Sequence, residues 1–155
     1  MKMKYILKLI ALIVLLPIFI GCEKKNAEIV EKQLDINPRS LNAVWQLEKM
    51  GETTIPSGSY FYLELMQEDM EFHIYENLNS SFANDEPGKF ELYDDTDAEK
   101  TAFYGSYTNH FSKEWEEDYY INSLTKSKMV WEGLETKEIL TFVKVEKVSV
   151  NEKQF

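Results

Sequence analysis

The densest group of side chains that could do chemistry in this sequence is the run of four carboxylates within residues 94–99. Clustered carboxylates can bind calcium, but an EF-hand loop that started at Asp95 would need glycine at position 100 and glutamate at position 106. The chain has Lys100 and Ser106 at these positions. We therefore expect a solvated, charged turn here and no metal site.

The remaining candidates for catalysis are sparse. His73 and His110 are the only histidines, and they lie in no HExxH or cysteine-histidine pattern that would hold zinc. The glycine-serine pairs lack the Gly-x-Ser-x-Gly arrangement of a nucleophile elbow. Glu116 and Glu117 are adjacent, and adjacency in sequence does not provide the separation of an acid and a base. We expect no cofactor, and a protein that is not an enzyme.

Cys22 is the only cysteine, and its surroundings indicate covalent modification. It follows a segment with three lysines in residues 1–8 and an apolar run over residues 9–20, which is shorter than the roughly 20 residues that span a bilayer. Gly21 then supplies a small residue directly before the cysteine. An ordinary secretory signal would end in an Ala-x-Ala-like site, and an uncleaved anchor would need a longer apolar run.

This arrangement resembles the signal of bacterial lipoproteins. The resemblance implies a signal peptide at residues 1–21 and lipid on Cys22, which would anchor the protein to a membrane of the bacterial cell envelope, in most such proteins the outer membrane. Several acyl chains hold a protein on a bilayer essentially permanently. The membrane face, periplasmic or surface, stays open.

The charge balance excludes two kinds of partner. The chain carries a formal charge of −10, and loss of Lys2, Lys4 and Lys8 with the signal peptide would lower it by three, to −13. A chain so acidic, without a basic stripe, is a poor candidate for binding nucleic acid or for docking on anionic headgroups. We therefore expect no nucleic-acid partner, and a membrane contact through lipid alone.

The elements that position the remaining side chains are predicted to be strands. Residues 22–40 are polar and suit a tether, whereas from Leu41 onward short aromatic and β-branched runs alternate with turn residues, as in an antiparallel all-β domain. We expect a loop over residues 77–88, a charged turn over residues 94–100 and a longer loop over residues 109–117. The eight predicted strands are Leu41–Lys49, Tyr60–Met66, Glu71–Glu76, Lys89–Tyr93, Ala102–Thr108, Asp118–Leu124, Lys128–Trp131 and Glu138–Val145.

Four short motifs resemble those of lipocalin-like domains, and one of them is Tyr60–Leu65, which is similar to a Tyr-Leu-Glu-Phe element. Leu41–Leu47 is similar to the opening Leu-x-Gly-x-Trp-x-Leu, with Ala43 in place of glycine, and Phe103–Tyr107 is similar to the later Gly-x-Tyr element. Trp115 before Tyr119 resembles a Trp-x-x-x-Tyr element. The resemblance implies an antiparallel eight-stranded lipocalin-like β-barrel over residues 41–148, with Trp45 buried at one end.

Two binding functions remain open for such a barrel. In the first, a small apolar or amphipathic ligand lies inside, and we expect Tyr62, Tyr75, Tyr104 and Trp131 around it, because these side chains combine aromatic area with polar tips. In the second, the barrel is plugged, and the loop with Phe111 and Trp115 docks on another envelope protein as a non-catalytic module. Other aromatics that could serve the same interior are Tyr60, Tyr107, Tyr119 and Tyr120.

Overall fold

The computed structural model describes residues 30–78, 84–108 and 115–149. The chain divides into two compact units, residues 1–30 and 31–155. Only Val30 of the first unit is described, so the expected signal peptide and Cys22 lie outside the described residues. Within the described ranges, no helix has the length and apolar character needed to cross a bilayer.

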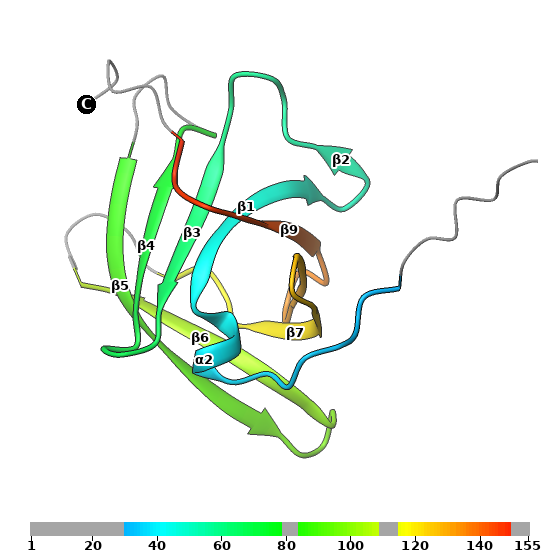
Figure 1. The fold of residues 1–155 in the computed structure, drawn as a ribbon. Helices are drawn as coiled ribbons and strands as arrows, with labels where there is room; N and C mark the ends of the chain where they lie inside the picture. The colour runs from blue at the N-terminus through cyan, green and yellow to red at the C-terminus, as the bar shows by residue number, and fades with distance from the viewer. Residues whose placement is uncertain (1–29, 79–83, 109–114, 150–155) are drawn as a thin grey trace, which may run out of the picture. The chain divides into compact units, whose positions relative to one another are not determined.

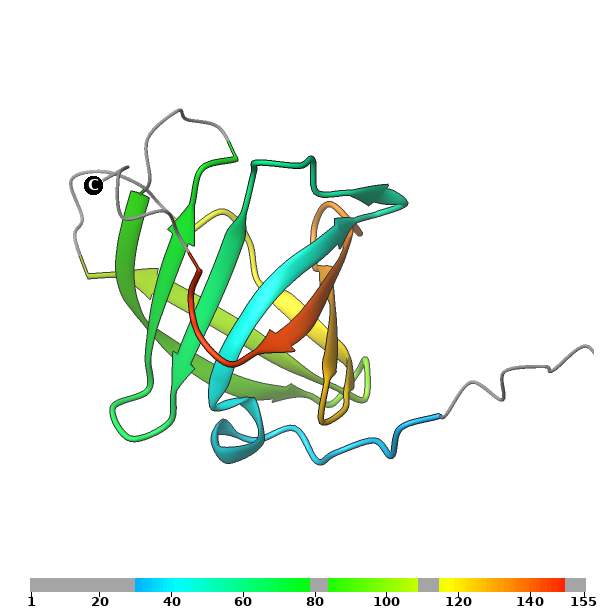
Figure 2. The same cartoon turned by 45° about the horizontal axis from the view of Figure 1, so that its top comes forward.

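The second unit is built almost entirely from antiparallel strands (Figures 1 and 2). Each strand from β3 onward pairs with the next strand along the chain, and β9 pairs with β1, which closes the sheet. β2 adds to the end of β1 outside this ring. The elements are α2 (Pro38–Leu41), β1 (Ala43–Met50), β2 (Thr53–Thr54), β3 (Phe61–Met66), β4 (Glu71–Glu76), β5 (Asn84–Asp95), β6 (Lys100–Tyr107), β7 (Tyr119–Leu124), β8 (Lys128–Gly133) and β9 (Ile139–Val145).

The predicted fold class is therefore confirmed as all-β, with a closed barrel of eight antiparallel strands. Connecting neighbours in sequence order is the pattern of an up-and-down barrel, the architecture that lipocalins share. Closure removes the free sheet edges that would otherwise offer unpaired backbone groups to other chains.

Strand alternation decides which side chains enter the barrel. In β4, Phe72, Ile74 and Glu76 are buried, whereas the residues between them are only partly buried. Successive side chains of a strand point to opposite faces, so this strand has one inner and one outer row. The same rule sorts the residues of the other strands below.

The expected loop over residues 77–88 is wrong in its second half. β5 already begins at Asn84, and its residues 84–89 pair with β4. Turn-forming residues favoured a loop here, but pairing with β4 overrides that local preference. Pro87 fits this place because β6 pairs with β5 only from Gly88 onward, and the carbonyl oxygen of Pro87 accepts a hydrogen bond from the Thr108 N–H at 2.9 Å.

The charged turn expected over residues 94–100 is shorter than predicted. Asp94 and Asp95 extend β5, and Lys100 starts β6, opposite Asp95 in the ladder. The Asp95 carboxylate accepts hydrogen bonds from the backbone N–H groups of Asp97 and Ala98, both at 3.0 Å, which stabilises a tight turn.

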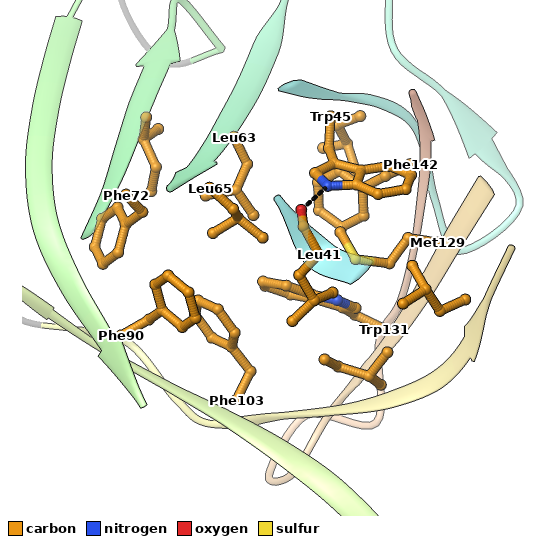
Figure 3. Packing of buried hydrophobic residues seen from close by; sticks show 14 of the residues in the cluster. Leu41, Trp45, Leu63, Leu65, Phe72, Phe90, Phe103, Met129, Trp131 and Phe142 are labelled. Carbon is orange, nitrogen blue, oxygen red and sulfur yellow. Dashed lines mark hydrogen bonds between the residues drawn. The ribbon is translucent and has the colours of Figure 1, made fainter. Parts of the chain in front are cut away.

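The barrel end at which β1 starts is closed by α2. Asn37 caps this single turn, accepting a hydrogen bond from the Ser40 N–H, and Pro38 follows at the first helical position. The turn places Leu41 over the barrel interior, where the Trp45 indole N–H donates to the Leu41 carbonyl at 2.8 Å (Figure 3). Trp45 is 1% exposed.

Part of the expected tether lies on the barrel. Leu34 and Ile36 pack against the core, and the Leu34 N–H donates to the Leu124 carbonyl at 2.8 Å. Gln33 adds hydrogen bonds to Ser123 and Leu124. The folded domain therefore includes chain that precedes the first predicted strand.

Aromatic rings fill much of the interior. Phe90 and Phe103 stack with their ring centres 5.1 Å apart, and Phe103 contacts Trp131 at 4.6 Å (Figure 3). Trp131 in turn contacts Phe142 from β9 at 5.3 Å. A core packed in this way stabilises the barrel without disulfide bonds.

Candidate functional site

The barrel interior is not filled completely at the end opposite α2. A cavity of about 80 Å³ lies there, where β4 and β6 end and β3, β7 and β9 begin. Its lining residues are almost all apolar or aromatic, with one carboxylate. They are Phe61, Leu63, Ile74, Tyr107, Trp115, Glu116, Tyr119, Trp131, Leu140 and Phe142. We call this the mouth cavity.

Four large rings form a continuous arc along the mouth cavity. The ring centres of Tyr107 and Trp115 are 5.6 Å apart, those of Trp115 and Tyr119 are 6.2 Å apart, and those of Tyr119 and Trp131 are 5.3 Å apart. Trp115 and Tyr119 meet nearly at a right angle, with 85° between their planes. The arc therefore presents ring faces in more than one direction.

Gly105 makes room for the Trp115 ring. A Cβ atom at position 105 would lie only 2.5 Å from the Trp115 Cζ3 atom, far inside normal contact distance. Gly105 is in the same strand phase as Phe103 and Tyr107, whose rings both contact Trp115 inside the barrel. The missing side chain allows a residue from the segment before β7 to enter the barrel mouth.

Two indole N–H groups at this end have no hydrogen-bond partner among the described residues. They belong to Trp115 and Trp131, and both nitrogen atoms are buried. Trp131 as a whole is 2% exposed. Buried polar groups are nearly always satisfied by protein, water or ligand, so an acceptor is expected for each of these donors.

Carboxylates surround the mouth. Glu76 shares the inner row of β4 with Ile74, and Glu86 shares the inner row of β5 with Gly88 and Phe90. Glu116 lines the cavity from its exposed rim. Among the described residues, three carboxylates are therefore placed at the open end of the barrel.

Burial and the nearby carboxylates raise the pKa of two phenol groups in the arc. Burial raises the pKa of Tyr107 to about 12, and the carboxylates of Glu116, Glu86 and Glu76 add to the increase. The pKa of Tyr119 is also raised, first by burial and then by nearby carboxylates, Glu117 foremost. Both phenols are therefore neutral at physiological pH and can donate hydrogen bonds.

Of the four residues predicted to surround a ligand, the structure places one at the mouth cavity. Trp131 lines it. Tyr62, Tyr75 and Tyr104 lie on the outer face of the barrel, because their neighbours in sequence take the inner positions. The structure therefore does not bring the four side chains together.

The three outer tyrosines have different surroundings. Tyr62 is buried, and its hydroxyl lies 3.4 Å from the Ser149 carbonyl oxygen, to which it donates. The Tyr75 hydroxyl donates to the Glu64 carboxylate at 3.3 Å. Tyr104 is 42% exposed.

Of the two residues expected to anchor a docking partner, the structure describes only Trp115. Phe111 lies outside the described residues. The Trp115 ring points into the barrel, where it contacts Phe72 at 5.4 Å as well as the residues of the arc. Trp115 therefore does not form an exposed patch in this structure.

Sequence reasoning did not place Glu116 at the cavity, and it considered Trp115 only as an exposed anchor in the docking alternative. Tyr107 and Tyr119 belonged to the wider set of aromatics but not to the four predicted ligand contacts. A signal was present, because Tyr107 is in phase with Phe103 and Tyr119 is in phase with Ile121, so each shares the apolar row of its strand.

Metal binding has no geometric support in the part of the chain that the structure describes. No group of three or more histidine, cysteine, aspartate or glutamate side chains there could hold a metal ion. His73, on the outer row of β4, pairs with Asp85 at 3.0 Å and stacks on Tyr75.

The architecture defines the class of this protein. It is a closed eight-stranded antiparallel barrel with an aromatic cluster at one end, consistent with the lipocalin-like fold that the sequence motifs resemble. The chain matches no protein-family model, no curated protein sequence and no solved structure.

Proposed function

We propose that this protein is a lipid-anchored lipoprotein of the bacterial cell envelope whose barrel binds a small amphipathic ligand at the mouth cavity without converting it. The observation that carries the binding function is the mouth cavity itself. An apolar cavity with a few converging polar groups is the usual form of a small-molecule site.

The size of the cavity limits what can enter. Its volume of about 80 Å³ corresponds to roughly three water molecules at their liquid volume. Sites for drug-sized ligands are several times larger, at about 300–1,000 Å³. The proposed ligand therefore inserts one compact group between Trp115 and Trp131, and the rest of it projects from the mouth.

The polar groups of the site specify the rest of the ligand. Two buried indole N–H groups need an acceptor, and neutral Tyr107 and Tyr119 add phenol groups to the same wall. The described lining residues are aromatic and aliphatic side chains with one carboxylate, and the proposed role is binding.

Native mass spectrometry of the protein purified from the cells that make it tests this function. We expect a small-molecule mass that is lost on denaturation. Filling the cavity by Leu140→Trp should abolish the bound mass, whereas Tyr104→Trp on the outer face should retain it. Retention of the ligand by the cavity variant, or robust turnover of an offered substrate, would contradict the proposal.

The anchor is tested separately. Cys22→Ser should leave an unprocessed precursor, and the intact mass of the membrane-purified protein should show acyl groups on a chain that starts at Cys22. A soluble mature form with an unmodified N-terminus would refute the anchor without affecting the binding site. Protease treatment of whole cells would then determine the membrane face.

A further inference from the structure

We propose that the group bound at the mouth cavity is an organic cation, an amine or quaternary ammonium, which also carries an oxygen atom close to its charge. This inference rests on the proposed function and specifies the chemistry of its ligand.

The first argument concerns charge. Glu76 and Glu86 occupy inner-row positions at the open end, and Glu116 lines the cavity rim. Among the described residues, the charged groups that act on Tyr107 are all carboxylates. Carboxylates placed at a narrow opening attract ions of the opposite sign.

The second argument concerns the kind of cation. Carboxylates that bind a metal must converge on one point, and in the described residues they do not. The wall of the cavity includes four large aromatic rings, namely those of Tyr107, Trp115, Tyr119 and Trp131. Ring faces attract a cation whose centre lies within about 6 Å, and the arrangement suits cations that are weakly hydrated, such as quaternary ammonium groups.

The third argument concerns the oxygen atom. A cation alone would leave the buried indole N–H groups of Trp115 and Trp131 without an acceptor. A hydroxyl or carboxylate oxygen one or two bonds beyond the charged group would supply that acceptor. The volume of about 80 Å³ suits a compact charged head with a short substituent and excludes a long chain.

Choline and two analogues separate these requirements. Neohexyl alcohol has the shape of choline but a carbon atom in place of the charged nitrogen, and tetramethylammonium keeps the charge but lacks the oxygen. Each would be titrated into ¹⁵N-labelled protein while the three tryptophan indole resonances are followed. Trp45 lies at the closed end and serves as an internal control, because its N–H already donates to Leu41.

We expect choline to shift the Trp115 and Trp131 resonances and to leave that of Trp45 in place. Neohexyl alcohol should bind at least about tenfold more weakly than choline, because it lacks the attraction to ring faces and carboxylates. Tetramethylammonium should bind more weakly than choline and shift the two indole resonances less.

Two variants with the same charge change locate the effect. Glu116→Gln at the rim should weaken choline binding about three- to tenfold, since one nearby carboxylate contributes on the order of 1 kcal/mol in a solvated setting. Glu91 lies on the outer face of β5, so Glu91→Gln should leave choline binding unchanged. Neither variant should alter the binding of neohexyl alcohol.

The outcomes distinguish this inference from the proposed function. Equal binding of choline and neohexyl alcohol would overturn the cation and leave a neutral ligand at the same site. Equal binding of choline and tetramethylammonium would overturn the requirement for oxygen. If Glu116→Gln and Glu91→Gln weaken choline equally, the attraction comes from the net charge of the protein, not from the mouth. Indole resonances that do not move with any of the three compounds would overturn the cation together with the present assignment of the site.

Discussion

The two ends of the barrel each contain a buried tryptophan, but the hydrogen bonding of the two indole N–H groups differs. At the closed end, the Trp45 N–H donates to the backbone carbonyl of Leu41, and α2 covers the ring. At the open end, the Trp131 N–H has no partner among the described residues, and its ring lines a cavity. Because buried polar groups are nearly always hydrogen-bonded, the two ends differ in how the polar atom of the tryptophan is accommodated.

The difference extends to the surroundings of each end. Leu41, Leu124 and Met129 are fully buried apolar side chains, so the closed end resembles an ordinary core. The open end combines aromatic rings with carboxylates such as Glu116. Departures from good packing and polar satisfaction are expected where a protein functions. The comparison therefore separates a closed, fully packed end from an open end that contains a cavity.

The largest effect on stability is expected from a substitution at the closed end. Trp45→Ala should lower the free energy of unfolding by about 3–5 kcal/mol, because it removes a fully buried large ring and leaves a cavity. Domains of this kind are stabilised by only about 5–15 kcal/mol, so the variant should be poorly folded. Urea denaturation followed by circular dichroism measures the change.

A conservative variant at the same position separates packing from hydrogen bonding. Trp45→Phe keeps a ring but removes the donor to the Leu41 carbonyl, so it should be less destabilising than Trp45→Ala. An unfolding midpoint for Trp45→Ala that equals that of the unmodified protein would contradict a structural role for the closed end.

A smaller effect is expected at the open end from Gly105→Ala. The added methyl group would collide with the Trp115 ring, and overpacking of this kind costs about 1–3 kcal/mol. The collision disappears if the ring is absent, so in a Trp115→Ala background the Gly105→Ala change should have little effect. A double-mutant cycle measured by urea denaturation gives the coupling between the two positions.

Additive effects in that cycle would show that Trp115 does not occupy the barrel mouth. The same variants bear on function, because Gly105→Ala should expel the ring from the arc and weaken choline binding without disturbing the indole resonance of Trp45. Loss of both signals would instead indicate general unfolding.

Period-two alternation and turn residues predicted the antiparallel strands, because these signals are local, whereas closure into a barrel was implied only by the resemblance to lipocalin-like domains. The local signals failed at Asn84–Gly88, where turn-forming residues are held in a strand by pairing with β4. They also predicted loop residues around Asp94 that belong to β5. In both places, pairing with the neighbouring strand outweighs the preference of the local residues.

The candidate site was harder to predict, because several strands carry aromatic residues in both phases. In β3, Tyr62 lies between Phe61 and Leu63, and either row could face inward on pattern alone. The structure turns Phe61 and Leu63 to the interior. The packing of the Trp115 ring against Gly105 could not be predicted either. It depends on tertiary packing and not on a local sequence pattern.

The smallest expected effect is a difference in acid sensitivity between the two ends. The Glu117 carboxylate accepts hydrogen bonds from the N–H groups of Glu135 and Thr136, at 2.8 and 3.1 Å, and from the Thr136 hydroxyl. Burial acts to raise the pKa of Glu117, but these hydrogen bonds outweigh it and hold the pKa below its usual value of 4.5. The turn between β8 and β9 is thereby tied to the segment that leads into β7.

Because the folded state favours the charged form, this tie contributes stability above the unfolded pKa of Glu117 and loses it as the pH falls through the lower folded pKa. Acidification should therefore shift the amide resonances of Glu135 and Thr136, and Glu117→Gln should remove that titration. The Trp45 indole resonance should not follow it, since its hydrogen bond joins two neutral groups. Parallel titration of Trp45 and Thr136 would contradict the separation of the two ends, because it would mean that acid opens the barrel as a whole.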